Sequence, residues 1–293
     1  MARLEVLKTY KIYIGGKFPR TESGRYYTPE NKGKKLGNIC LSSRKDFRNA
    51  VVAARGAFEG WSGKTAFNRS QILYRIAEML EGRTEQFVHE LQQQGSTKKA
   101  ATLEVETAVD RLVYHAGWAD KLSQVFGSVN PVAGTYFNFS VHEPQGVVVA
   151  VAPEDNGLIG LVTMIAETIC TGNTCIAVAS ESMPLCSITF AEVLNSSDVP
   201  GGVVNILTGT KEELLPHIGS HMDVNAVLFG VNDADALSAL KKASTGNLKR
   251  IYDRSAADWM SQDEEHPYHM LNVMEVKTTW HPIEHIAASG SAY

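Results

Sequence analysis

The sequence predicts an α/β protein with a Rossmann-like, mostly parallel sheet, flanking helices and a small additional antiparallel sheet. Short apolar runs alternate with longer amphipathic segments through residues 146–257, which is the pattern of strands joined by helical crossovers. A separate run, Tyr136–His142, alternates apolar and polar residues and predicts a strand with one wet face. The clearest crossover unit is a strand, a helix and a strand at Gly146–Ala152, Leu158–Cys170 and Thr174–Ala179.

The N-terminal part predicts a hairpin followed by helices. Tyr10–Ile14, the Gly15–Gly16 turn and Arg25–Tyr27 are typical of two strands joined by a tight turn. Apolar residues at helical spacing then predict helices. They cover Arg44–Trp61 after a cap at Ser42–Ser43, a segment from Asn68 to an interruption at Gly82, Thr84–Gln94, and Leu103–Phe126 with His115 on its apolar face. We interpret His115 as a hydrogen-bonded histidine of a packed helix, because no acid or nucleophile recurs beside it.

The C-terminal half continues the alternation and ends in a polar segment and a strand. Asp258–His269 is polar and predicts a loop, and Met270–Pro282 alternates as a strand does. We divide the chain into residues 1–126, 127–145, 146–257 and 258–293. Further elements are a helix after Pro184, strands at Val203–Leu207, Asn225–Phe229 and Leu248–Tyr252, and helices at Lys211–Ile218 and Asp233–Ala243.

Composition narrows the classes of function. The chain has 293 residues, 44% of them hydrophobic, a net charge of −4 and a pI near 6.1. This charge argues against nucleic-acid binding. The start, MARLEVLKTYK, has no apolar core of signal-peptide length, and Leu158–Cys170 is too short to span a bilayer. We therefore expect a cytoplasmic protein without a membrane partner.

Cysteine and histidine spacing gives little support for a metal site. Cys40, Cys170, Cys175 and Cys186 show no C-x-x-C spacing, so we expect buried reduced thiols and no disulfide framework. His266, His269, His281 and His285 have suggestive spacings, but prolines adjoin both pairs and no cysteine is near. We therefore predict no metal.

Four features carry a resemblance to a known family. They are EPQGVVVAVAP (Glu143–Pro153), the Gly172–Asn173 pair, Ser180–Glu181 and VPGGVVNILTG (Val199–Gly209). In this order they resemble the NAD-binding half of the aldehyde dehydrogenase superfamily. The chain is most similar to the inactive C-terminal module of the two-module class, family 16, as a degenerate copy without the catalytic domain.

The family's reaction needs a cysteine thiolate as nucleophile and a glutamate that activates water. These lie in segments that read like G-Q-x-C and E-L-G-G, and neither segment occurs here. After Asn247–Arg250 the chain reads IYDRSAADWM and passes to its tail. The resemblance therefore implies no catalytic residue in this chain.

The nucleotide crevice that the resemblance implies is also altered. The family's P-W-N, whose asparagine stabilises the oxyanion, becomes Pro153, Glu154, Asp155, and Asn156 would serve only after a one-residue slip. We expect Glu154 and Asp155 to point apart in a solvated loop. Ser180 and Glu181 keep part of the family's K-P-S-E, whose lysine is lost.

Pro153, Ser180 and Glu181 are the candidate cofactor-binding residues, as remnants of the family's site. For Glu181 two interpretations stay open. Its carboxylate binds the ribose of a nucleotide, or its negative charge stabilises the N-terminus of the helix that follows Pro184. Side chains also replace pyrophosphate-contacting glycines in Thr208–Lys211 and Phe229–Asn232. We expect that the chain binds no cofactor. If it does bind one, we expect that cofactor to be NAD.

The resemblance implies an assembly role for the strands at 136–142 and 270–282. Two alternatives stay open for the second strand: addition to a partner's sheet, and folding back on Tyr136–His142. The first hypothesis is a non-catalytic structural or regulatory subunit of a full-length aldehyde dehydrogenase paralogue, or a homo-oligomer. The second is an NAD-dependent component of an aldehyde-oxidising complex, and the third is a stand-alone nucleotide-binding module.

Overall fold

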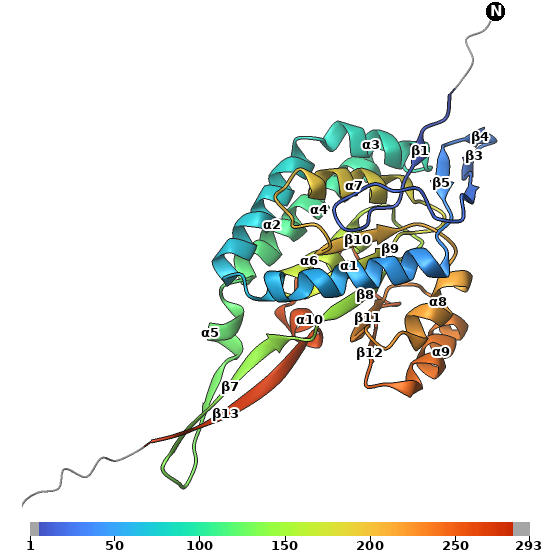
Figure 1. Cartoon of the computed structure of the whole chain (residues 1–293). Coiled ribbons are helices and arrows are strands. Elements are labelled where there is room, and N and C mark those ends of the chain that lie inside the picture. Colours follow the sequence, from blue (N-terminus) through green and yellow to red (C-terminus); the bar gives the residue numbers. More distant parts are fainter. Residues whose placement is uncertain (1–5, 284–293) are drawn as a thin grey trace, which may run out of the picture.

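The computed structural model of the chain describes residues 6–283. It has a compactly layered body from which a narrow sheet projects (Figure 1). Within residues 6–283, no helix combines the length and the hydrophobicity that crossing a bilayer requires.

A five-stranded parallel sheet forms the centre, as the alternating pattern predicts. Its strand order is β10-β9-β8-β11-β12, and every neighbouring pair is parallel. The three strands at the centre of the order, β9, β8 and β11, are buried along their whole length, which is why their sequences read as continuous apolar runs. The strands are β8 (Val147–Val151), β9 (Thr174–Val178), β10 (Val204–Leu207), β11 (Ala226–Phe229) and β12 (Arg250–Asp253).

Helices cover both faces of this sheet. Alternate residues of β8 enter different cores: Val148 and Ala150 face one, and Val147 and Val149 face the other. The first core is closed by α2 (Ala66–Glu81), α3 (Thr84–Gln93), α4 (Lys98–Trp118), α6 (Ile159–Cys170) and α7 (Leu185–Asn195). The second is closed by α1 (Arg44–Ser62), α8 (Lys211–Ser220) and α9 (Ala234–Ala243).

The helices from α1 to α9 lie where the sequence predicts helices, with one of them divided in two. Ser43 caps α1 in a capping box, because its hydroxyl accepts from the Asp46 N–H while the Asp46 carboxylate accepts from the Ser43 N–H. The predicted helix at Leu103–Phe126 is two helices, α4 and α5 (Leu122–Phe126). His115 is fully buried and its Nδ1 lies 2.7 Å from the Arg111 carbonyl oxygen, which confirms the packed interpretation.

The predicted N-terminal hairpin is wrong. β1 (Thr9–Tyr10) pairs in parallel with β5 (Asn38–Cys40), and β2 (Tyr26–Tyr27) pairs with β5 from the other side. Gly15–Gly16 does make a tight turn, but it joins only Ile14 and Lys17. β1 pairs with β5 and not with β2 because β5 enters the core, whereas β2 is half-exposed. A separate two-stranded ribbon joins β3 (Glu30–Asn31) and β4 (Lys34–Lys35).

The projecting sheet, which we call the arm, consists of β6 (Ser128–Asn130), β7 (Tyr136–Pro144) and β13 (Met274–Pro282). β13 runs antiparallel to β7 over all nine of its residues. The tail strand therefore folds back on its own chain, which was one of the two alternatives.

The segment between β12 and β13, which we call the cover segment (residues 254–273), is more ordered than a polar loop. It contains a short helix η2 (Gln262–Glu264) and α10 (Pro267–Asn272), so the first residues of the predicted 270–282 strand are helical. Arg254 anchors the segment through ion pairs to Glu167 at 3.1 Å and to Glu264. Burial raises the pKa of Glu167, and the charge of Arg254 opposes that rise. The four-part division of the chain stays a prediction.

Candidate functional site

The order of the central sheet defines where a ligand site would lie. β8, β9 and β10 follow one another toward one edge, and the chain then returns so that β11 lies on the other side of β8. The reversal between β8 and β11 is a topological switch point, and ligands of open α/β sheets bind beyond the carboxyl ends of the strands there. The loops at this point begin at Pro153 and Gly230.

Trp259 of the cover segment fills the space beside this switch point. Its side chain is only 3% exposed. A Cβ built on Gly230 would lie 3.1 Å from Trp259 Cζ2 and 3.2 Å from Pro153 Cδ, so the indole packs directly on the loop after β11. The Arg254 guanidinium lies 5.0 Å from the Trp259 ring centroid, which fixes the indole from a further side.

Pro153 does not face an open crevice. It is buried, and a Cβ on Gly160 would lie 2.5 Å from Pro153 Cγ, so the proline ring packs on the first turn of α6. Asn156 does not offer its amide to the crevice either. Its Oδ1 accepts from the Gly160 N–H at 2.9 Å and its Nδ2 donates to Asp155 at 2.8 Å.

The prediction that Glu154 lies free in a solvated loop is wrong. Its carboxylate accepts four hydrogen bonds from the loop after β9. The donors are the Ser180 hydroxyl at 2.8 Å, the Glu181 N–H at 3.0 Å, the Ser182 N–H at 3.0 Å and the Ser182 hydroxyl at 2.7 Å. Asp155 is exposed, so the two acids do point apart.

Lys211, the first residue of α8, completes this group of donors. Its ammonium forms an ion pair with Glu154, and its side chain is 11% exposed. Burial lowers the pKa of Lys211 to about 7. We call Ser180, Glu181, Ser182 and Lys211 the anion cradle.

Ser180 and Glu181 therefore have roles that their sequence positions did not predict. Ser180 is 2% exposed and binds Glu154. The Glu181 carboxylate accepts from the Lys211 N–H at 3.4 Å, at the start of α8. The Tyr27 hydroxyl donates to the Glu181 carbonyl at 3.2 Å.

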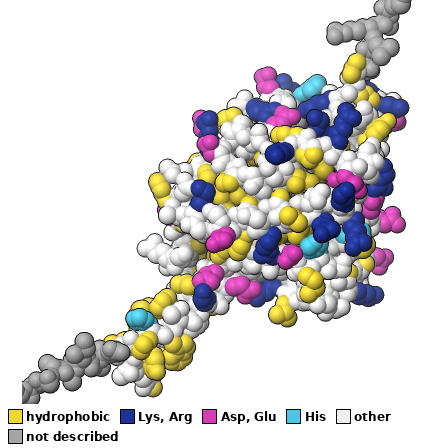
Figure 2. All heavy atoms as spheres, in the orientation of Figure 1, with side chains coloured by type: hydrophobic (Ala, Val, Ile, Leu, Met, Phe, Trp, Pro, Cys, Tyr) yellow, Lys and Arg dark blue, Asp and Glu magenta, His cyan; other side chains and the backbone are white. Residues whose placement is uncertain are grey.

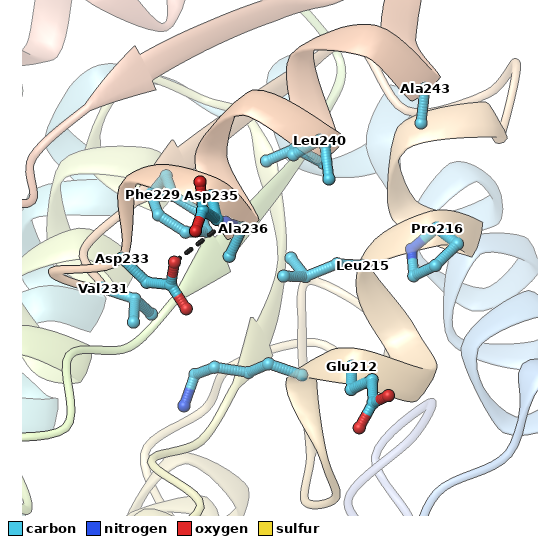
Figure 3. Close-up of a pocket in the computed structure, with 12 residues that line it drawn as sticks. Glu212, Leu215, Pro216, Phe229, Val231, Asp233, Asp235, Ala236, Leu240 and Ala243 are labelled. Atoms are coloured by element: carbon cyan, nitrogen blue, oxygen red, sulfur yellow. Dashed lines mark hydrogen bonds between the residues drawn. The ribbon is translucent and has the colours of Figure 1, made fainter.

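Two hollows adjoin the cradle. The described residues that line a groove of about 670 Å³ include five acids and one lysine, Lys211; the acids are Glu30, Glu154, Glu181, Glu212 and Asp233. A second cavity of about 560 Å³ lies between α8 and α9. Figure 3 shows Leu215 and Leu240 pointing into the space between these two helices. Amphipathic patterning marked both helices but gave no sign of the cavity.

The cysteines offer no nucleophile in this region. All four are buried and free. Burial raises the pKa of Cys170 and of Cys175 to about 12, which keeps both thiols protonated at neutral pH.

Metal ligands do not converge in the part of the chain that the structure describes: it holds no group of three or more histidine, cysteine or acidic side chains able to bind an ion. His266 and His269 have ring centroids 5.8 Å apart, and His285 lies outside the described residues.

Comparison with known proteins places this geometry in context. The model of the aldehyde dehydrogenase family matches residues 19–252. The chain is 30% identical over 249 residues to "Aldehyde dehydrogenase, cytosolic 1" of Elephantulus edwardii, covering 82% of this chain and 49% of that protein. It is 31% identical to the putative aldehyde dehydrogenase DhaS of Bacillus subtilis, covering 83% and 50%.

The fold comparison agrees. An NAD+ complex of aldehyde dehydrogenase from Bacillus cereus superposes with a TM-score of 0.79 at 26% identity, covering 84% of this chain and 50% of that one. The chain thus spans about half the length of the relatives it matches.

Proposed function

The chain belongs to the aldehyde dehydrogenase family, and within it we propose a non-catalytic member that serves as a structural or regulatory subunit of an active aldehyde dehydrogenase. In this proposal it is a degenerate copy that resembles the inactive module of family 16. The observation that carries the proposal is the position of Trp259, which is buried against the loop after β11, beside the switch point where ligands of such sheets bind.

The thiol chemistry supports the same conclusion. The family's reaction starts from an ionised cysteine, whereas Cys170 and Cys175 are buried with pKa values near 12. Asn156, the nearest amide to the family's oxyanion position, is engaged at the start of α6. We therefore assign this chain no step of the oxidation.

The residues present do not fit NAD, and we propose that the chain works without it. The Glu154 carboxylate already takes the donors of the anion cradle, and the groove beside it has five acids against one lysine. A dinucleotide's pyrophosphate would be repelled by this charge.

The arm is the surface that we propose for the partner. Its apolar side chains are largely exposed: Val129 68%, Tyr136 45%, Phe137 44%, Val276 62% and Trp280 58%. Figure 2 shows hydrophobic side chains gathered on the projecting sheet. Among residues 6–283, β13 pairs with β7 alone and no strand lies on its other edge. An open edge with apolar neighbours favours strand addition. The partner is a full-length paralogue, with a second copy of this chain as the other candidate.

A second function has one observation in its favour. The cavity between α8 and α9 has apolar walls from Leu215, Phe229 and Leu240 and lies beside Lys211. Such a cavity suits a flat heterocycle, and matching structures from Bacillus cereus and of PnpE contain nicotinamide adenine dinucleotide. The alternative is a component that binds NAD within an aldehyde-oxidising complex.

Two measurements test these proposals. Affinity purification of the tagged chain from its host, followed by native mass spectrometry, is expected to give a complex with a cysteine-competent aldehyde dehydrogenase. When the purified chain is titrated with NAD in a calorimeter, we expect no heat of binding at millimolar concentrations of NAD. NAD binding in the micromolar range would overturn the cofactor-free proposal and support the second function.

A further inference from the structure

We propose that a groove between α1 and the C-terminal end of α8, which we call the basic groove, binds a small organic phosphate. Its volume is about 350 Å³, within the range of small-molecule sites. Its lining includes Arg44, Phe47 and Arg48 from α1, and His217, His221 and Met222 from the last turn of α8 and the residues after it.

The basic groove is separate from the anion cradle. Lys211 of the cradle and His221 of the groove mark opposite ends of α8, about 15 Å apart along the helix axis. The proposal also does not rest on the subunit role, because both the groove and its test belong to the isolated chain.

The charge of the basic groove differs from that of the rest of the chain. Two arginines and two histidines line it, and none of its described lining residues is acidic. The whole chain has a net charge of −4, and the groove beside the cradle is lined by five acids. Figure 2 shows lysine, arginine and histidine side chains close together over α1 and α8. A hollow lined by one sign of charge concentrates ligands of the opposite sign, so this groove selects anions.

The two arginines have no counter-charge of their own. Among residues 6–283, neither Arg44 nor Arg48 forms an ion pair with an acid. The acids at the start of α1 are already engaged, because Glu22 pairs with Lys45 at 2.9 Å and Asp46 accepts in the capping box. A guanidinium without a carboxylate partner is available to hold two oxygens of a phosphate.

The position of the arginines is unfavourable for the helix that carries them. Arg44 is the first residue of the 19-residue helix α1, and Arg48 lies one turn further on. The N-terminus of a helix carries a partial positive charge, so cations there oppose the macrodipole. Residues that contradict local stability occur mainly at functional sites, which supports a binding role for this pair.

Phe47 and Met222 give the basic groove an apolar part. Phe47 is buried, and its ring centroid lies 5.8 Å from that of His221 with the ring planes at 80°. Met222 is exposed. An aromatic substituent on the phosphate would cover these side chains. A phosphate monoester carries close to two negative charges at neutral pH and three acceptor oxygens, so it matches both the arginines and the apolar part.

Three ligands separate the contributions of charge and ring. Phenyl phosphate has a dianion and an aromatic ring, inorganic phosphate has no ring, and benzoate has a ring with a single negative charge. Each is titrated into the native chain in a calorimeter at constant ionic strength. We expect phenyl phosphate to bind with a Kd of about 0.1–1 mM and the other two ligands at least about fivefold more weakly. Equal affinity for inorganic phosphate would overturn the organic substituent, and equal affinity for benzoate would overturn the phosphate.

Arg48→Gln tests the basic groove against a matched control. Lys45→Gln removes an equal charge from the same part of α1, but Lys45 is exposed and its ammonium pairs with Glu22 outside the groove lining. We expect Arg48→Gln to weaken the binding of phenyl phosphate at least about tenfold, and Lys45→Gln to weaken it less than about twofold. Equal weakening by both variants would overturn the assignment to the groove.

Stability is measured on the same variants. Arg48 is exposed and its charge opposes the dipole of α1, so Arg48→Gln is expected to resist urea at least as well as the native chain. A loss of phosphate binding in this variant therefore reports the site and not the fold.

The ring of His221 reports the same site from the α8 side. Burial lowers the pKa of His221, the charge of Asp223 raises it, and the charges of Lys249 and Arg48 lower it; His217 shares the groove. A bound dianion favours the charged imidazolium, so we expect phenyl phosphate at saturation to raise the pKa of His221 by at least about 0.5.

Nuclear magnetic resonance of the histidine ring protons measures this pKa, and His221→Gln assigns the signal. The proposal is overturned if phenyl phosphate gives no heat of binding up to about 10 mM, or if it binds and leaves the pKa of His221 unchanged.

Discussion

The carboxyl end of the central sheet and the arm differ in how far the chain's own side chains cover them. At the sheet, polar donors and open space are taken by the chain's own side chains: Glu154 fills the anion cradle and Trp259 fills the switch point. On the arm, Val276 and Trp280 stay exposed, and no strand of the described part of the chain pairs with the outer edge of β13. At the sheet the chain's own side chains take the donors although a groove of about 670 Å³ adjoins them, whereas on the arm apolar side chains stay exposed.

This difference indicates where to look for function. An exposed apolar edge is an aggregation hazard unless a partner covers it. The comparison between the two regions therefore leads to the proposal of a subunit. The predictions below test the arm, the anchor of the cover segment and a buried histidine, in that order.

The largest effect is expected on the arm. Val276→Asp places a charge on the open edge of β13, where 62% of Val276 is exposed, and is expected to weaken assembly with the partner at least 100-fold, because a desolvated unpaired charge opposes strand addition. Co-purification from the host measures the loss. Leu248→Asp is the control, since Leu248 is 99% exposed but lies outside the arm; an equal loss in both variants would contradict the role of the arm.

The second effect concerns the anchor of the cover segment. Arg254→Ala leaves Glu167 fully buried without its ion pair, and is expected to lower the free energy of unfolding by about 3–5 kcal/mol. Arg250→Ala removes an exposed pair with Glu275 and is expected to cost at most about 1 kcal/mol. Urea denaturation of both variants measures the difference, and similar values for the two would show that the cover segment is not anchored by Arg254.

The third effect is a dependence of stability on pH. Burial lowers the pKa of His115 to about 3, from 6.5 in the unfolded chain. The unfolded state therefore binds more protons between these values, so the contribution is fully present above pH 6.5 and is lost as pH falls. Its loss is about 1.4 kcal/mol per pH unit below 6.5.

Urea denaturation from pH 7.5 to 4.5 follows this loss. His115→Gln is the control, because glutamine keeps a donor for the Arg111 carbonyl and does not titrate in this range. Equal slopes of stability against pH in the native chain and in this variant would show that His115 is not the group responsible.

The body of the fold was predictable because its signals are local. The apolar runs at Val147–Val151 and Thr174–Val178 are too continuous for half-exposed strands, and Ser43 with Asp46 marks a helix start by spacing alone. Hairpin pairing of Tyr10 with Tyr26–Tyr27 failed because β5 lies later in the sequence and offers the better-buried partner for both.

The candidate site was less predictable because its contacts are distant in sequence. Ser180 and Glu181 were found by resemblance, but the partner of Ser180 is Glu154 and the partner of Glu181 is the start of α8. Trp259 lies in a segment whose composition indicates a loop, and only the packing against Gly230 shows that it fills the switch point. A local sequence pattern does not predict contacts between residues that are distant in the sequence.

The most direct test of the central proposal is the mass and composition of the native complex that contains this chain. The proposal predicts a defined stoichiometric assembly with an aldehyde dehydrogenase that has an ionisable active-site cysteine, and a change in that enzyme's activity or assembly when this chain is removed. A monomer, or a homodimer without such an enzyme, would contradict it.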